Sequence, residues 1–205
     1  MALKLAKIEV EIREISLREK PAHMLQVSPK GTVPVLVLPD GNVIDESLEI
    51  MLWAMQKTML KNTREQNDAL QANIHEPSRA SPQRQLIYVN DTSFKKHLDC
   101  YKYPERNFQS NHKKSQLEYR QLGEIFLAQL ENLLQQKAYL FGEKPSFADY
   151  AIFPFIRQFA AVNSTWFDGE NAENAPYPKL LDWLKSLVES ELFINIMQKQ
   201  PTFTA

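Results

Sequence analysis

The sequence predicts an α/β domain followed by an all-helical domain. Residues 1–60 alternate between helix-like and strand-like patterns, whereas apolar residues recur at helical spacing after residue 83. The stretch between them is polar, unpatterned and interrupted by two prolines, as is typical of a linker. We therefore divide the 205 residues into an N-terminal domain (1–60), a linker (61–82) and a helical domain (83–205).

The chain opens with residues typical of the last turns of a helix, and a strand-like pattern follows. Ile8, Val10 and Ile12 alternate with charged residues, which predicts a half-buried strand over residues 8–15. The next proline can begin a helix, so we expect a short one over Ala22–Val27.

A hairpin and a longer helix complete the N-terminal domain. The β-rich run Val33–Leu38 is followed by Pro39-Asp40-Gly41, which has the composition of a tight turn. Residues 42–44 are expected to return antiparallel. Asp45-Glu46-Ser47 then places acidic and hydroxyl groups at the start of a helix, where free backbone N–H groups favour them.

Three features define the helical domain. Ser146 and Asp149 are spaced as in a capping box and precede an apolar run. Pro178 can begin another helix, and a last short one is expected over about 192–197. A further helix is predicted from the 3.6-residue spacing of Leu122, Ile125, Phe126, Leu130, Leu133 and Leu134.

Composition excludes several functional classes. The net charge of -1 argues against a nucleic-acid binder, and no apolar run is long enough to span a membrane. The N-terminus lacks the apolar core of a secretory signal, so a cytoplasmic location is expected. Cys100 is the single cysteine, and no pair of the four histidines has metal-ligand spacing, so no metal site is expected.

Two short motifs could carry chemistry. If the Val33–Pro34 bond were cis, the backbone of Val33 would be free to pair with an extended peptide; an ordinary strand-start proline is the alternative. Glu46 and Ser47 at a helix start could grip an α-amino acid, with the ammonium on Glu46 and the carboxylate on Ser47. Simple helix capping is the alternative here.

In order and spacing, these motifs resemble those of the cytosolic glutathione transferase family, particularly its omega-like and related bacterial members. The motifs are Lys20-Pro21, Ser28 through Leu36, and Asp45-Glu46-Ser47. Tyr139 through Gly142 and Ser146 through Asp149 resemble the family's C-terminal signature. The resemblance implies a thioredoxin-like N-terminal domain, an all-α C-terminal domain and glutathione as co-substrate.

The resemblance also implies roles for individual residues. Val33 would pair its backbone with the cysteinyl part of glutathione, and Pro34 would be the family's cis proline. Glu46 and Ser47 would hold the γ-glutamyl end. Lys20 falls where omega-like members place a lysine against a glutathione carboxylate, although a solvated surface lysine is the alternative.

We find no counterpart of the family's first strand and thiol-activating residue in this chain, and the resemblance implies that the chain begins inside the first helix. We therefore expect no catalytic residue here and a weakened N-terminal domain, because the flanking strands would lack a partner. Cys100 has basic neighbours and is a conceivable substitute nucleophile, but an inert cysteine is the expected role.

In the family the second substrate, a small electrophile or disulfide, is held by the helical domain. The candidates here are Tyr101, Tyr103 and Arg106, whose segment is too polar for a core helix face, and Trp166, because aromatic walls with one polar group usually line such pockets; core packing is the alternative. Two functions remain open. One is glutathione conjugation or thiol transfer, which would need the missing segment, and the other is a non-catalytic ligand-binding or protein-interaction module. The resemblance also implies a possible homodimer.

Overall fold

The computed structural model describes most of the chain: residues 1–62, 81–105, 114–169 and 174–203. The chain divides into two compact units, Met1–Ala69 with Glu191–Ala205, and Leu70–Ser190. The first contains helices and a small sheet and the second is helical, so the predicted fold class is confirmed. The predicted linker, 61–82, lies almost wholly outside the described residues.

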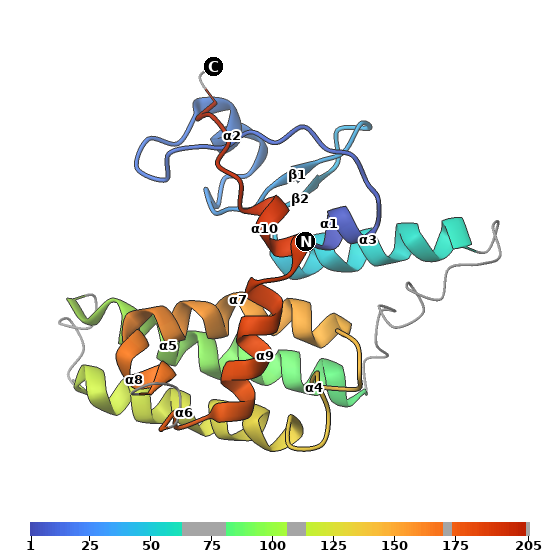
Figure 1. Cartoon of the computed structure of the whole chain (residues 1–205). Helices are drawn as coiled ribbons and strands as arrows, with labels where there is room; N and C mark the ends of the chain where they lie inside the picture. The colour runs from blue at the N-terminus through green and yellow to red at the C-terminus, as the bar shows by residue number, and fades with distance from the viewer. Residues whose placement is uncertain (63–80, 106–113, 170–173, 204–205) are drawn as a thin grey trace. The chain divides into compact units, whose positions relative to one another are not determined.

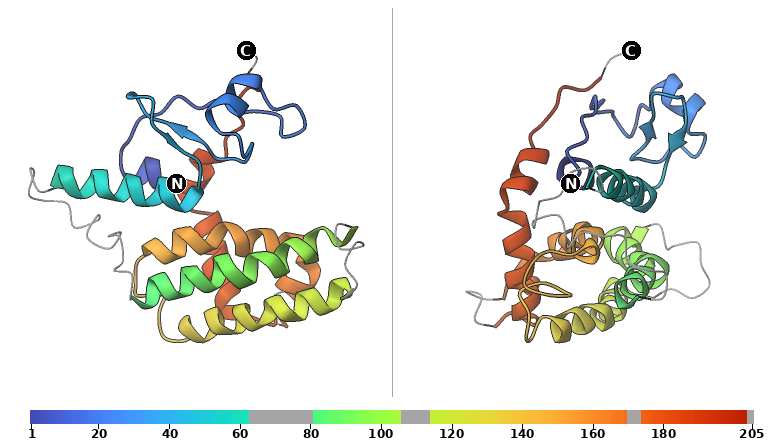
Figure 2. Two further views of the ribbon diagram at one scale, coloured as in Figure 1. Left: turned by 180° about the vertical axis from the view of Figure 1, so that it is seen from behind. Right: turned by 90° about the vertical axis from the view of Figure 1, so that its right-hand side faces the viewer.

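The first unit is built around one hairpin and one long helix. Strands β1 (Leu36–Val37) and β2 (Val43–Ile44) pair antiparallel and lie between α2 (Ala22–Val27) and α3 (Ser47–Asn62) (Figures 1 and 2). The predictions of a helix over 22–27, of the turn and of the helix start at Asp45-Glu46-Ser47 are confirmed. Helix α3 packs against the short α1 (Ala2–Leu5), which confirms helical structure at the start of the chain. The C-terminal α10 (Glu191–Ile196) groups with this unit.

The strand predicted over residues 8–15 is wrong. Val10 and Ile12 are 40% and 64% exposed, and the segment makes a single isolated bridge, between Glu14 and Thr202. Alternation predicts a strand only where a neighbouring strand completes the hydrogen-bond ladder. Within the described ranges no such neighbour lies beside residues 8–13. The β-rich run 33–38 is likewise shortened to the two residues of β1.

The second unit packs its helices around an aromatic and aliphatic core. A continuous helical rod runs through α4 (Pro82–Val89), the π-helical turn η1 (Asn90–Phe94) and α5 (Lys95–Lys102). The rod contacts α6 (Gln116–Leu133) and α7 (Phe147–Val162), and α9 (Pro178–Val188) runs across α6 and α7 (Figures 1 and 2). The short α8 (Ser164–Asp168) follows α7.

The predicted helix starts in this unit are confirmed. Asp149 accepts hydrogen bonds from the backbone N–H and hydroxyl of Ser146, at 2.7 and 2.6 Å, as a capping box requires. Pro178 begins α9. One periodic position was misassigned, because Ile125 is 70% exposed whereas Leu127 is fully buried.

Candidate functional site

The β1–β2 hairpin brings the two predicted binding motifs to the same place. Its register pairs Leu36 with Ile44. Pro34 lies two residues before this pair and Glu46 two residues after it. Both motifs therefore flank the open end of the hairpin, although they are separated by twelve positions in the sequence.

Val33 presents an unpaired backbone at this end. The Val33–Pro34 bond is cis, which confirms that prediction. Val33 is 47% exposed, and its N–H and C=O make no hydrogen bond with another described residue. An extended peptide could therefore pair with this residue by main-chain hydrogen bonds, as in strand addition.

The start of α3 supplies groups that suit an amino acid. The carbonyl of Glu46 accepts the N–H of Ile50 at 2.9 Å, so Glu46 is the flanking residue and Ser47 the first helical one. The N–H groups of the first turn have no partner within the helix, and the helix dipole adds positive potential there. Both side chains are exposed, so the Ser47 hydroxyl and these N–H groups can receive a carboxylate while Glu46 receives a cation.

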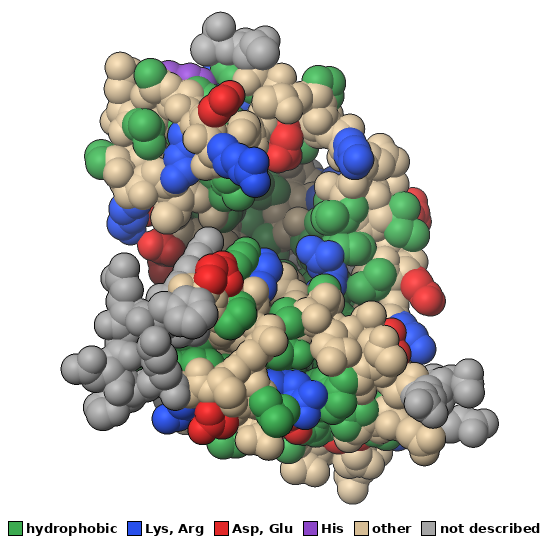
Figure 3. Space-filling view, turned by 90° about the vertical axis from the view of Figure 1, so that its left-hand side faces the viewer, with side chains coloured by type: hydrophobic (Ala, Val, Ile, Leu, Met, Phe, Trp, Pro, Cys, Tyr) green, Lys and Arg blue, Asp and Glu red, His purple; other side chains and the backbone are tan. Residues whose placement is uncertain are grey.

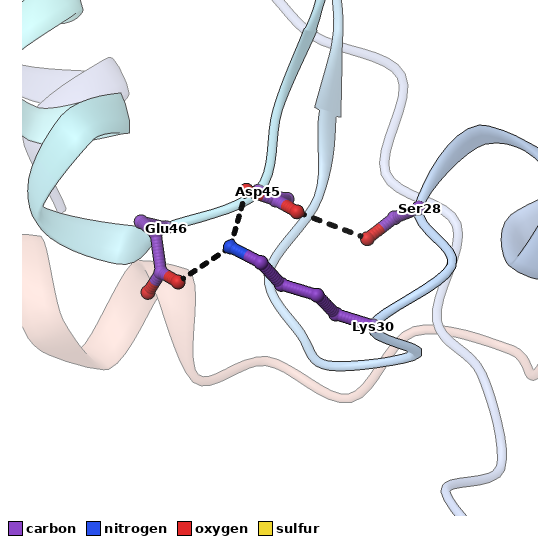
Figure 4. Close-up of polar contacts among 4 residues, drawn as sticks. All are labelled: Ser28, Lys30, Asp45 and Glu46. Atoms are coloured by element: carbon purple, nitrogen blue, oxygen red, sulfur yellow. Dashed lines mark hydrogen bonds and ion pairs between the residues drawn. The ribbon is translucent and has the colours of Figure 1, made fainter.

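A lysine that sequence reasoning missed sits against this helix start. Lys30 Nζ lies 3.0 Å from Glu46 Oε1 and 3.4 Å from Asp45 Oδ1 (Figure 4). The hydroxyl of Ser28 donates to the other oxygen of Asp45 at 3.4 Å. Hydrogen bonding to Glu46, and then to Asp45, raises the pKa of the Lys30 ammonium above its usual value.

Lys20 precedes α2 in the sequence, and its side chain reaches the turn that follows α2. A methyl group placed on Gly31 would be 3.6 Å from Lys20 Nζ, so the lysine covers the residue two positions before Val33. Gly31 has φ +61, and its N–H donates to the carbonyl of Ser28 at 2.9 Å, which closes a tight turn. The exposed Lys20 ammonium thus stands near the predicted peptide-binding backbone, where it could meet a carboxylate.

The candidates for the second substrate are spread through the helical unit. Tyr101 is 3% exposed and its ring packs 4.8 Å from that of Phe159, so the argument that its segment is too polar for a core fails there. Burial also raises the pKa of Tyr101 above its usual value. Tyr103 is half-buried at the end of α5, and Arg106 lies outside the described residues.

Trp166 is held in an aromatic and cationic setting. Its ring lies 4.3 Å below the Arg120 guanidinium and meets Phe159, Phe167 and Tyr177 edge to face. This geometry stabilises α8 against α6 and α7. A role for Trp166 in a substrate pocket stays a prediction.

A surface groove of about 440 Å³ lies elsewhere on the helical unit. Its lining includes Lys137, Glu143, Lys179 and Asp182, and none of the predicted site residues. The groove therefore mixes charged side chains of both signs with neutral polar and apolar residues such as Gln135, Ala138 and Tyr139.

The described residues also give information on surface charge, metal ligands and membrane spans. On the face drawn in Figure 3, acidic and basic side chains are interspersed over the described residues. Within the described ranges, no group of three His, Cys, Asp or Glu residues could hold a metal ion. No described helix combines the length and apolar character needed to cross a bilayer.

Family models match parts of both units. The model of the glutathione S-transferase N-terminal domain matches residues 1–56, and that of the C-terminal domain matches residues 124–186. Together the matches span more than half of the chain. No curated protein sequence matches it.

Several solved structures share the fold. BphK, a bacterial GST in a ternary complex, gives a TM-score of 0.69 at 21% identity, over 96% of this chain and 90% of that chain. The glutathione transferase URE2P6 from Phanerochaete chrysosporium, in complex with oxidized glutathione, gives a TM-score of 0.73 at 17% identity, over 95% of this chain and 86% of that chain. A sphingomonad glutathione S-transferase complexed with glutathione gives a TM-score of 0.68 at 17% identity, over 96% of this chain and 90% of that chain. At these identities the likeness establishes the fold alone.

Proposed function

Because the chain belongs to the glutathione S-transferase family, we propose that its N-terminal unit binds glutathione at the open end of the β1–β2 hairpin. The backbone of Val33 pairs with the cysteinyl residue of the tripeptide. Glu46 binds the γ-glutamyl ammonium, Ser47 and the first turn of α3 bind the neighbouring carboxylate, and Lys20 binds a second carboxylate. Similar proteins have been solved with glutathione bound, which supports this ligand.

The observation that carries the proposal is the joint placement of three complementary groups in one unit. A free main-chain N–H and C=O at Val33 lies at the same hairpin end as a carboxylate and a helix N-terminus. Glutathione offers a matching peptide backbone, ammonium and carboxylate. A peptide without the γ-linked amino acid head would leave Glu46 and Ser47 unused.

Catalysis is the finer part of the proposal. Conjugation requires that the glutathione thiol be deprotonated and then attack a small electrophile; thiol transfer requires the thiolate to attack a disulfide. Residues 1–3 offer neither a hydroxyl nor a thiol to assist deprotonation. We therefore propose that these 205 residues bind glutathione but turn it over slowly, which keeps a non-catalytic binding module as the second candidate function.

Calorimetric titration of the full chain with glutathione tests the binding. Glu46→Gln should weaken binding by about tenfold to a hundredfold, because a hydrogen bond between charged groups contributes about 1.5–3 kcal/mol. The matched control is Glu49→Gln, which removes the same charge from an exposed position in the first turn of α3. Equal losses in the two variants, or no glutathione binding at millimolar concentration, would contradict the assignment.

Turnover separates the two functions. The same preparation is assayed with an activated aryl halide and with a small disulfide, each in the presence of glutathione. Binding without turnover supports the module. Rapid turnover would show that another group activates the thiol; alkylation of Cys100 would then reveal whether this thiol is responsible.

A further inference from the structure

The ammonium of Lys30 already occupies the position that the proposed site reserves for a ligand ammonium. It contacts Glu46 Oε1 at 3.0 Å and Asp45 Oδ1 at 3.4 Å, from a loop that precedes the hairpin (Figure 4). A primary ammonium has three donors and no acceptor, so Lys30 and a ligand amine would make the same kind of contact.

The surrounding backbone holds Lys30 in reach of both carboxylates. Ser28 is 1% exposed and its hydroxyl donates to Asp45 Oδ2, which leaves Oδ1 directed at Lys30. The turn between Ser28 and Gly31 is closed by a backbone hydrogen bond of 2.9 Å. The base of the lysine is therefore fixed while its tip reaches the start of α3.

The contact itself is easily broken. The side chains of Lys30 and Glu46 are 57% and 61% exposed, so water and salt screen their attraction. An arriving ligand can displace the lysine at small cost. Two ammonium groups held by the same carboxylate would repel one another, so the two cations bind in competition.

We propose that Lys30 is an internal competitor for the ammonium subsite formed by Asp45 and Glu46, and that it sets the affinity and selectivity of this subsite. The inference rests on the proposed glutathione site. A ligand with a free primary amine can replace the lysine, whereas a ligand without one leaves the Lys30 pair in place. Lys30 therefore lowers the affinity for glutathione and reduces its advantage over ligands that lack a primary amine.

The experiment measures binding of glutathione and of N-acetylglutathione to the full chain by calorimetry at physiological salt. Lys30→Met keeps the aliphatic stem and removes the competing charge. It should tighten glutathione binding about threefold to fivefold, the upper part of the range expected for one exposed ion pair, because Lys30 contacts two carboxylates. It should not tighten binding of the N-acetylated ligand, which has no ammonium to profit from the vacated carboxylates.

The matched control is Lys57→Met, which removes the same charge from an exposed position on α3, where Lys57 lies 5.6 Å over the Trp53 ring. The change in glutathione affinity of this variant measures the long-range effect of removing one positive charge. Circular dichroism verifies that both variants fold.

The possible outcomes distinguish a failure of the Lys30 inference from a failure of the proposed glutathione site. Weaker glutathione binding by the Lys30→Met variant would overturn the inference, because Lys30 would then contact an anionic group of the ligand. If the Lys30→Met and Lys57→Met variants bind glutathione with equal affinity, the inference is overturned as well, although the glutathione site would stand. Absence of binding by both the unmodified chain and the Lys30→Met variant would overturn the proposed function and the inference with it.

Discussion

Replacing Asp149 with alanine should destabilise the helical unit strongly. The carboxylate is fully buried and accepts four hydrogen bonds that join three segments. Oδ1 accepts from the backbone of Leu140 at 3.0 Å and from the indole of Trp183 at 2.7 Å. Oδ2 accepts from the backbone and the hydroxyl of Ser146. One side chain therefore fixes the start of α7, the preceding loop and α9.

The magnitude follows from the donors that alanine would leave unpaired. The Ser146 hydroxyl can rotate to another partner, but two backbone N–H groups and the Trp183 indole cannot. At about 1.5 kcal/mol for each buried donor, the loss is about 4.5 kcal/mol. Burial raises the pKa of Asp149 despite its hydrogen bonds, so desolvation of the carboxylate offsets part of this loss and leaves about 3 kcal/mol.

Urea unfolding of the full chain measures this loss, followed by far-UV circular dichroism and tryptophan fluorescence. The control is Asp182→Ala, which removes an exposed carboxylate from α9 and should change the free energy of unfolding by less than about 0.5 kcal/mol. The reasoning fails if Asp149→Ala costs less than about 1 kcal/mol or behaves like the control. In that case the four hydrogen bonds would contribute little beyond the cost of burying the charge.

Two further predictions concern the same unit. Gly123→Ala should cost about 1–2 kcal/mol, since the new methyl would lie 2.5 Å from Phe159 Cε2, which outweighs the gain in helix propensity. In a Phe159→Leu background the same substitution should destabilise the chain less. If urea unfolding shows that Gly123→Ala costs the same free energy in both backgrounds, this contact is not the cause. Burial raises the pKa of Tyr150 to about 12, so between pH 10 and 12 the unfolded chain loses this proton before the folded one and stability falls with pH. Tyr150→Phe should flatten that fall in pH-dependent unfolding measurements, and an unchanged slope would exclude Tyr150 as a cause.

The sequence predicted best those features that depend on local chemistry. Ser146 and Asp149 lie three residues apart in one helical turn, so a capping box can be recognised without knowing the fold. The same holds for Pro178 at the start of α9 and for Gly41, whose φ of +86 suits the predicted turn. The two binding motifs at the hairpin end were predicted from their order and spacing along the chain.

Features that depend on distant partners were missed. The alternation of Val10 and Ile12 has the period of a strand, but the sequence does not reveal that residues 8–13 lack a neighbouring strand within the described chain. Tyr101 was judged too polar in its surroundings, yet its ring fits against Phe159 in the core. Lys30 meets Glu46 across sixteen positions, a contact that depends on the register of the hairpin and has no local signature.

The hairpin site does not depend on the segment that fails to form a strand. Its geometry is set by the turn, where Leu38 N–H donates to the carbonyl of Asn42 at 2.8 Å and Asn42 N–H donates to Asp40 at 3.0 Å. The backbone N–H and then the side chain of Asn42 stabilise the Asp40 carboxylate and lower its pKa. Helix α3 is anchored independently, through buried apolar residues that face α1. The geometry of the hairpin end is therefore separable from the pairing of residues 8–13, and a chain that lacks a paired strand there can still present Val33 and Glu46 together.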